Sequence, residues 1–97
     1  MAAIQLVKFR LNAGVSEDEF RALNERFQRE VAPKLPGLVR REATTADGEW
    51  LLVLRYTDLE SAHKAGRSDT GEISKQFMSF IDMSTMSASF YDLVSEG

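Results

Sequence analysis

Cysteine is absent from this 97-residue sequence, and histidine occurs once, as His63. Without cysteine the chain has no disulfide, no thiolate nucleophile and no cysteine-based zinc site. A single histidine also excludes a metal site built from several imidazoles. A carboxylate-only site for magnesium or calcium stays open, but the acidic residues do not follow an EF-hand-like spacing. We therefore expect no metal site.

Long hydrophobic runs and an excess of basic charge are also lacking. The longest aliphatic run is Leu51–Leu54, which is far too short for a transmembrane helix. Residues Met1–Ile4 lead directly into a strand-like segment and do not form a basic region followed by an apolar one. No signal peptide is visible, so we expect a cytoplasmic protein. The formal net charge of −3 argues against binding to nucleic acid or to an anionic membrane.

What is present fits a single domain over residues 1–97, with 43% hydrophobic and 28% charged residues. The most informative stretch is Trp50–Tyr56, which is apolar on both faces of a predicted strand until Arg55. The helices of so short a chain cover only one face of a sheet. We therefore expect a second copy of the chain on the other face.

The predicted elements follow the order βαββαβ. Strands are predicted over 4–11, 38–44, 49–56 and 86–94. The first helix begins at Ser16 and ends before Pro33. The second helical region comprises a helix over 58–65, a loop over 66–71 and a helix with an apolar stripe over 73–81. Residues 45–48 form a hairpin turn, in which Asp47 and Gly48 tolerate positive φ, and residues 82–85 form another turn. This order is typical of a ferredoxin-like α+β fold, an antiparallel sheet with helices on one face.

Polar residues mark the predicted helix starts. Ser16 and Glu19 have the spacing of a capping box, whose side chains satisfy free amide groups of the first turn. Asp58 is predicted to cap the second helix, and Asp69 with Glu72 the third.

The second predicted strand is the most polar one. Alternation places Val39 and Ala43 on one face and Arg40 and Glu42 on the other. Charged side chains are typical of strands near the edge of a sheet, so we expect this strand there.

Several short motifs resemble one protein family from residue 4 to residue 94. They are Val7–Leu11, Gly14–Glu17, Leu35–Gly37, Asp47–Trp50 and Phe77–Asp82. On these motifs the chain is similar to the dimeric α/β-barrel superfamily, and within it to an uncharacterised branch of the antibiotic-biosynthesis-monooxygenase-like proteins. The resemblance implies a homodimeric α/β barrel whose two sheets pack face to face, with a cavity between sheet and helices in each subunit.

Characterised members of that superfamily include cofactor-independent quinol or polyketide oxygenases and haem-degrading enzymes. The haem-degrading members use an Asn on the first strand with a Trp and a His in the second helical region. Here the first strand has no Asn, Trp50 lies in the third strand, and His63 comes early in its helix. Stress-responsive members carry a His in the first strand, where this chain reads Gln5–Val7. Haem is thus not supported by these motif residues, and we expect no cofactor.

Two candidate site residues are charged or titratable. His63 has the only side chain whose usual pKa suits proton transfer near neutrality. It shares a helical face with Leu59 and Ala62, which would direct it toward the cavity as a catalytic residue; the plainer interpretation, a partly solvated histidine at the helix edge, is favoured. Arg55 would either bind a carboxylate or phenolate-like oxygen of a substrate, or pair with a carboxylate of a neighbouring strand or subunit.

Three candidate site residues are aromatic. Trp50, Tyr56 and Tyr91 would line a pocket for an aromatic substrate. Large aromatic side chains in strands also occur in cores and interfaces, and both interpretations stay open.

The sequence leaves three functions open. The first is a cofactor-independent monooxygenase for a small aromatic or quinol-type molecule, which supplies its own electrons once it is deprotonated. The second is a non-catalytic barrel that binds a small hydrophobic or aromatic molecule, or haem with His63 as an axial ligand. The third is a structural or stress-response dimer whose assembly is the functional unit.

Overall fold

The computed structural model describes residues 1–68 and 71–96. The elements in these residues are β1 (Ala3–Leu11), α1 (Glu17–Glu30), a 3-10 helix η1 (Ala32–Lys34), β2 (Leu38–Ala46), β3 (Glu49–Tyr56), α2 (Leu59–Ser68), α3 (Glu72–Ser79) and β4 (Ile81–Asp92). This confirms the predicted α+β, ferredoxin-like order. None of the described helices has both the length and the apolar composition needed to cross a membrane.

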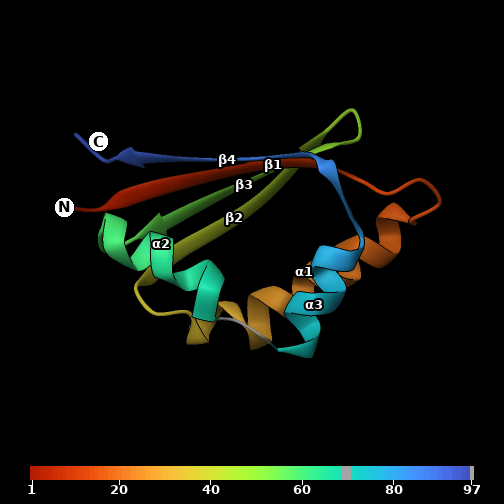
Figure 1. The fold of residues 1–97 in the computed structure, drawn as a ribbon, viewed down its shortest axis with the longest axis horizontal. Helices are drawn as coiled ribbons and strands as arrows, with labels where there is room; N and C mark the ends of the chain where they lie inside the picture. Colours follow the sequence, from red (N-terminus) through yellow and green to blue (C-terminus); the bar gives the residue numbers. More distant parts are fainter. Residues whose placement is uncertain (69–70, 97) are drawn as a thin grey trace.

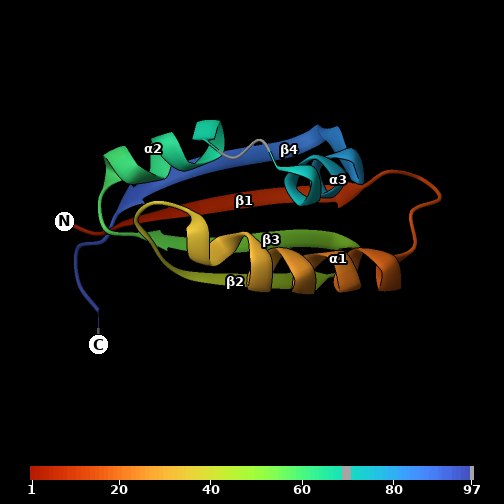
Figure 2. The same cartoon turned by 90° about the horizontal axis from the view of Figure 1, so that it is seen from below.

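The four strands form one antiparallel sheet in the order β2-β3-β1-β4. The helices lie on one face of this sheet (Figure 1). Seen from below, α1 runs along β2 and β3, whereas α2 and α3 lie on the side of β4 (Figure 2). The predicted edge position of the second strand is confirmed, and β3 is an inner strand between β2 and β1.

The core lies between the sheet and the helices. Residues of β3 alternate, so Trp50, Leu52, Leu54 and Tyr56 face the helices, and all four are buried. Phe20 of α1 is fully buried against them, with its ring centroid 4.9 Å from that of Trp50 and 4.8 Å from that of Phe77. Burial of each such side chain stabilises the fold by about 1.5–3 kcal/mol, which fixes the helices against the sheet.

The helix starts follow the predictions where they are described. The Ser16 hydroxyl accepts a hydrogen bond from the Glu19 amide at 3.3 Å, and the Asp58 carboxylate accepts one from the Ser61 amide at 2.7 Å. Asp69 lies outside the described residues. Gly71 occupies the N-cap of α3 and provides no side-chain cap.

Several boundaries differ from the sequence expectation, and the first is that β2 continues to Ala46, into the predicted hairpin turn. Helix α2 continues to Ser68, so residues 66–68 are helical and not part of a loop. Residues 82–85 belong to β4 and not to a turn, because β4 pairs with β1 across a register shift and the Arg10 amide donates to the Thr85 hydroxyl at 2.8 Å. Strand β4 then ends at Asp92, before Val94.

A β-bulge at the start of β2 changes which side chains face inward. The register shifts between Leu38 and Arg40, so Val39 is 60% exposed and does not share the inward face with Ala43 as predicted. Arg41, paired with the inward Leu54 of β3, is buried beneath the sheet instead.

Candidate functional site

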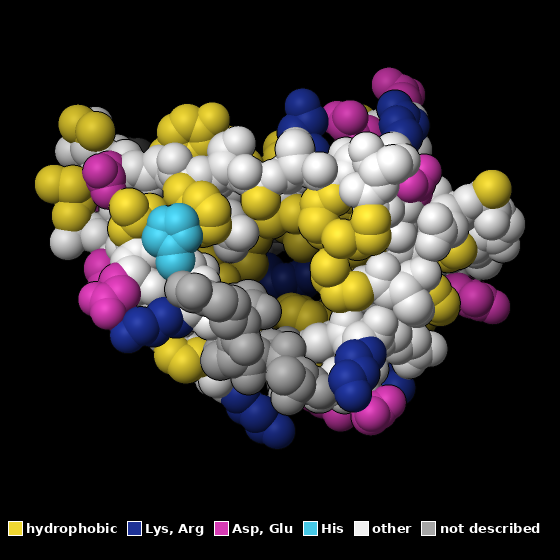
Figure 3. Space-filling view, viewed as in Figure 1, with side chains coloured by type: hydrophobic (Ala, Val, Ile, Leu, Met, Phe, Trp, Pro, Cys, Tyr) yellow, Lys and Arg dark blue, Asp and Glu magenta, His cyan; other side chains and the backbone are white. Residues whose placement is uncertain are grey.

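A cavity of about 300 Å³ lies between the inner face of the sheet and the helices. Its apolar lining comprises Val7, Phe9, Phe27, Leu35, Leu52, Leu54, Ala65, Phe77, Met78, Ile81, Met86 and Ala88, and its polar lining comprises Gln5, Arg41, Tyr56 and Ser74. The cavity opens to the surface: Figure 3 shows a hollow between hydrophobic side chains with a basic side chain at its bottom. Arg41 is the basic residue of the lining. Mostly apolar walls with a few convergent polar groups are typical of a small-molecule site.

Arg41 is held in this wall by contacts from two helices. Its side chain is 7% exposed, and its Nη1 donates a hydrogen bond of 3.0 Å to Oε1 of Gln28 on α1. The guanidinium carbon lies 4.6 Å from the ring centroid of Phe27 and 5.6 Å from that of Phe77, within the range of cation–π attraction. Its Nη2 is buried and has no hydrogen-bond partner.

Burial shifts the ionisation of both titratable groups in the cavity. Burial lowers the pKa of Arg41 to about 10, and it raises the pKa of Tyr56, an effect that the nearby positive charge of Arg41 partly opposes. Arg41 is therefore charged and Tyr56 protonated near neutral pH. Among the described residues that line the cavity there is no aspartate, glutamate or histidine. Within the described part of the chain, the site thus places one positive charge in an apolar wall without a carboxylate partner.

The aromatic candidates of β3 have different surroundings. Tyr56 lines the cavity, as one of its two interpretations requires. Trp50 is also buried, but its neighbours are other rings of the core: it stacks almost parallel to Phe9 at 6.5 Å between ring centroids. Trp50 is not part of the cavity wall.

Arg55 and Tyr91 lie together on the opposite face of the sheet. Both pair with Ile4 of β1, one from each side. Arg55 forms an ion pair with Glu96, with 2.6 Å between Nη1 and Oε2, and Tyr91 is 55% exposed. Neither side chain reaches the cavity, because the sheet lies between.

His63 lies on the exposed side of α2. Its imidazole packs on the ring of Phe90, with 4.2 Å between centroids, and it does not line the cavity. The structure therefore does not bring His63 together with Tyr56, and a catalytic role for it stays a prediction. Within the described ranges no cluster of three or more His, Asp or Glu side chains could hold a metal ion.

Sequence reasoning missed Arg41 and its partner Gln28. The available signal is that Arg41 has the same strand parity as Ala43, which places a guanidinium on the inward face. The β-bulge, which also turns Leu38 inward, cannot be predicted from the local sequence, because the bulge depends on how β2 pairs with β3.

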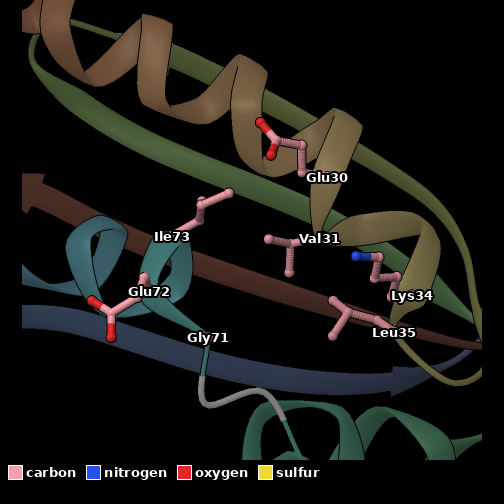
Figure 4. A pocket seen from close by; sticks show the side chains of 7 residues that line it. All are labelled: Glu30, Val31, Lys34, Leu35, Gly71, Glu72 and Ile73. Atoms are coloured by element: carbon pink, nitrogen blue, oxygen red, sulfur yellow. The ribbon is translucent and has the colours of Figure 1, made fainter.

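A second hollow of about 380 Å³ lies between the end of α1 and the start of α3 (Figure 4). It is lined by Glu30, Val31, Lys34, Leu35, Gly71, Glu72 and Ile73. Its charged side chains are exposed and therefore screened by water, which weakens any selection of a ligand. Leu35 lines both hollows, so the two are neighbours.

No protein-family model matches the sequence, and no curated protein matches it significantly. Solved structures do share its fold. SnoaB of Streptomyces nogalater, described as a cofactor-independent oxygenase, has a TM-score of 0.76 at 14% identity, covering 98% of this chain and 95% of that one. A conserved protein of Methanosarcina mazei Go1 has a TM-score of 0.72 at 18% identity, covering 94% and 91%.

A third structure, a "putative Antibiotic biosynthesis monooxygenase" of Chloroflexus aurantiacus J-10-fl, has a TM-score of 0.73 at 13% identity, covering 100% of this chain and 97% of that one. Identities this low establish the fold alone. The fold of the single chain that the sequence motifs implied is thereby confirmed.

Proposed function

We propose that the protein binds a small aromatic or quinol-type molecule in the cavity beneath the sheet and oxidises it as a cofactor-independent monooxygenase. The observation that carries this proposal is the cavity itself, which is open to the surface and mostly apolar, with Arg41 and Tyr56 in its wall. Removing apolar ligand surface from water contributes about 25 cal/mol per Å² to binding. The likeness in fold to a cofactor-independent oxygenase supports the same proposal.

The proposed oxidation requires the protein to bind the substrate and stabilise its negative charge, and it depends less on reactive side chains. An activated CH₂ group beside an aromatic ketone loses a proton, and the resulting carbanion passes electrons to O₂. One oxygen atom replaces the two hydrogens as a new carbonyl and the other leaves as water, so the substrate supplies all four electrons. The protein would bind the anion, orient it and exclude bulk water.

A second candidate is binding without catalysis. It is favoured by the absence of Asp, Glu and His from the described cavity lining, since these side chains are the usual general bases at neutral pH. Haem is one ligand to include: a Soret shift on adding haemin that disappears in His63→Ala would support the axial-ligand hypothesis, and an unchanged shift would contradict it.

Oxygen uptake with a panel of quinols and anthrones tests the proposal. Val7→Phe places a ring in the cavity and should abolish uptake, whereas Val39→Phe adds the same ring at an exposed position and should retain it. Product mass should rise by one oxygen and fall by two hydrogens for each anthrone. Ligand binding without uptake would favour the second candidate. Neither binding nor uptake would leave a structural dimer as the remaining function.

We also propose that the functional unit is a homodimer formed through the outer face of the sheet. Ile4, Leu6, Leu51 and Val53 lie on that face and stay half-exposed in the single chain. The helices cover the opposite face, so they cannot bury these apolar side chains. A second copy of the chain, packed on the outer face, would remove them from water.

A further inference from the structure

We infer that the ligand of the cavity carries one ionised oxygen, as a phenolate, enolate or carboxylate on an aromatic body, and that Arg41 binds this oxygen. The inference rests on the proposed function, because it concerns the ligand of the same cavity.

The first argument is the unbalanced charge of Arg41. A guanidinium that is 7% exposed ordinarily has a carboxylate partner, since an isolated charge is costly to remove from water. Here the contacts are the neutral amide of Gln28 and the faces of two phenylalanine rings. Nη2 is buried and has no acceptor, and the Arg41 side chain lines the cavity, so an anionic group that enters the cavity can supply the partner that this guanidinium lacks.

The second argument is the surroundings of that donor. The hydrogen bond between a guanidinium and an anionic oxygen is about twice as strong as a neutral one, and it gains further where water is excluded. The remaining lining is almost entirely apolar and contains several aromatic rings. A ligand with a single acidic oxygen on an aromatic body matches both the guanidinium and the apolar lining. A cation would be repelled by Arg41, and a dianion would leave one of its charges unpaired.

The same contact explains how a ligand can ionise although the described cavity lining contains no Asp, Glu or His as a general base. Arg41 stabilises the ionised form of a bound phenol or enol, which lowers the pKa of the ligand. A ligand acidic enough to lose its proton to water needs no aspartate, glutamate or histidine in the wall. Arg41 would then favour the anion that reacts with O₂.

A nitrophenol is a suitable probe, because its phenol and phenolate absorb at different wavelengths. We expect the wild-type protein to lower the apparent pKa of bound 4-nitrophenol below that of the free probe. We also expect it to bind the phenolate roughly tenfold to a hundredfold more tightly than the neutral ether 4-nitroanisole, as a charge-assisted hydrogen bond predicts. In Arg41→Met the preference should vanish and the pKa of bound probe should rise, since an apolar cavity disfavours the anion.

Arg26→Met is the matched control, because Arg26 is exposed on α1, away from the cavity lining and from the outer face of the sheet, and pairs with Glu30. It should behave as wild type. Tighter binding of 4-nitrobenzoate than of 4-nitrophenolate would support a carboxylate ligand, and the reverse order a phenolate or enolate. Equal binding of phenolate and ether by wild-type protein would overturn the inference and leave the proposed function standing. Failure of every probe to bind would overturn both, and neither result depends on whether the variant folds.

Discussion

At the scale of a single residue, the guanidinium of Arg41 is expected to destabilise the folded protein, because it is buried and has no carboxylate partner among the described residues. We expect Arg41→Met, an apolar side chain of similar reach, to leave the free energy of unfolding unchanged or raise it by about 1–4 kcal/mol. Urea denaturation measures this. A large decrease would instead show that packing on Phe27 and Phe77 is what retains the guanidinium.

Gln28 provides the control for this prediction. Gln28→Ala should lower the free energy of unfolding of the wild type by about 1–3 kcal/mol, since it leaves Nη1 of Arg41 unpaired. In the Arg41→Met background the same change should have little effect. Equal losses in both backgrounds would mean that the two side chains are not coupled.

For the site residues, the periodicity of the sequence predicts which side chains share a face of a strand or helix, but it does not predict which of these faces is turned toward the core. Tyr56 follows from the alternation of β3, where the large apolar residues set the inward parity. In α2 the sequence grouped Leu59, Ala62 and His63, yet the structure buries Ala62 and Ala65 and leaves the other two exposed. Small side chains face the sheet there because the helix packs close to it, a distance that the local sequence does not specify.

Helix α2 shows at the scale of an element how a single cap is linked to pH. Hydrogen bonds from the backbone amide and the side chain of Ser61 lower the pKa of Asp58. A lowered folded-state pKa stabilises the protein above the usual pKa of an aspartate, and this stabilisation is lost as the pH falls through the lowered value. Asp58→Ala should therefore reduce the free energy of unfolding at neutral pH.

The loss caused by Asp58→Ala should shrink when urea denaturation is repeated in acid. Asp58→Asn is the matched control, since asparagine caps a helix without titrating. Its advantage over alanine should be the same at both pH values. A loss in Asp58→Ala that does not depend on pH would contradict the linkage.

The order of elements could be predicted because each has a local pattern, such as the capped start of α1 and the hairpin turn before β3. The turn expected over 82–85 was wrong for a reason of the same kind. Its small polar residues are typical of turns, but a hydrogen bond to Arg10, 75 residues earlier in the chain, draws Thr85 into β4. Long-range pairing of this kind leaves no signal in a local window.

At the scale of the whole molecule, the outer face of the sheet governs assembly. We expect the wild-type protein to sediment as a dimer at micromolar concentration. Val53→Glu should shift it to a monomer, because it places a charge on the half-exposed face, whereas Ala22→Glu on the exposed side of α1 should leave the dimer intact. A wild-type monomer at that concentration would contradict the homodimer.

The two faces of β3 separate assembly from folding. Leu52 is 6% exposed in the core, so Leu52→Glu should prevent folding and not merely dissociation. Circular dichroism distinguishes the two outcomes. A folded monomer in Leu52→Glu would mean that the inward face of β3 is wrongly assigned.

The contact between Gln28 and Arg41 has a spectroscopic consequence. The chain has three glutamines: Gln5 lines the cavity, Gln28 accepts a hydrogen bond from Arg41, and Gln76 is exposed on α3. Selective ¹⁵N labelling of glutamine would therefore give three side-chain amide signals, one inside the cavity, one on the guanidinium and one as an internal reference. Occupancy of the cavity could then be followed in solution without a coloured ligand or a substitution.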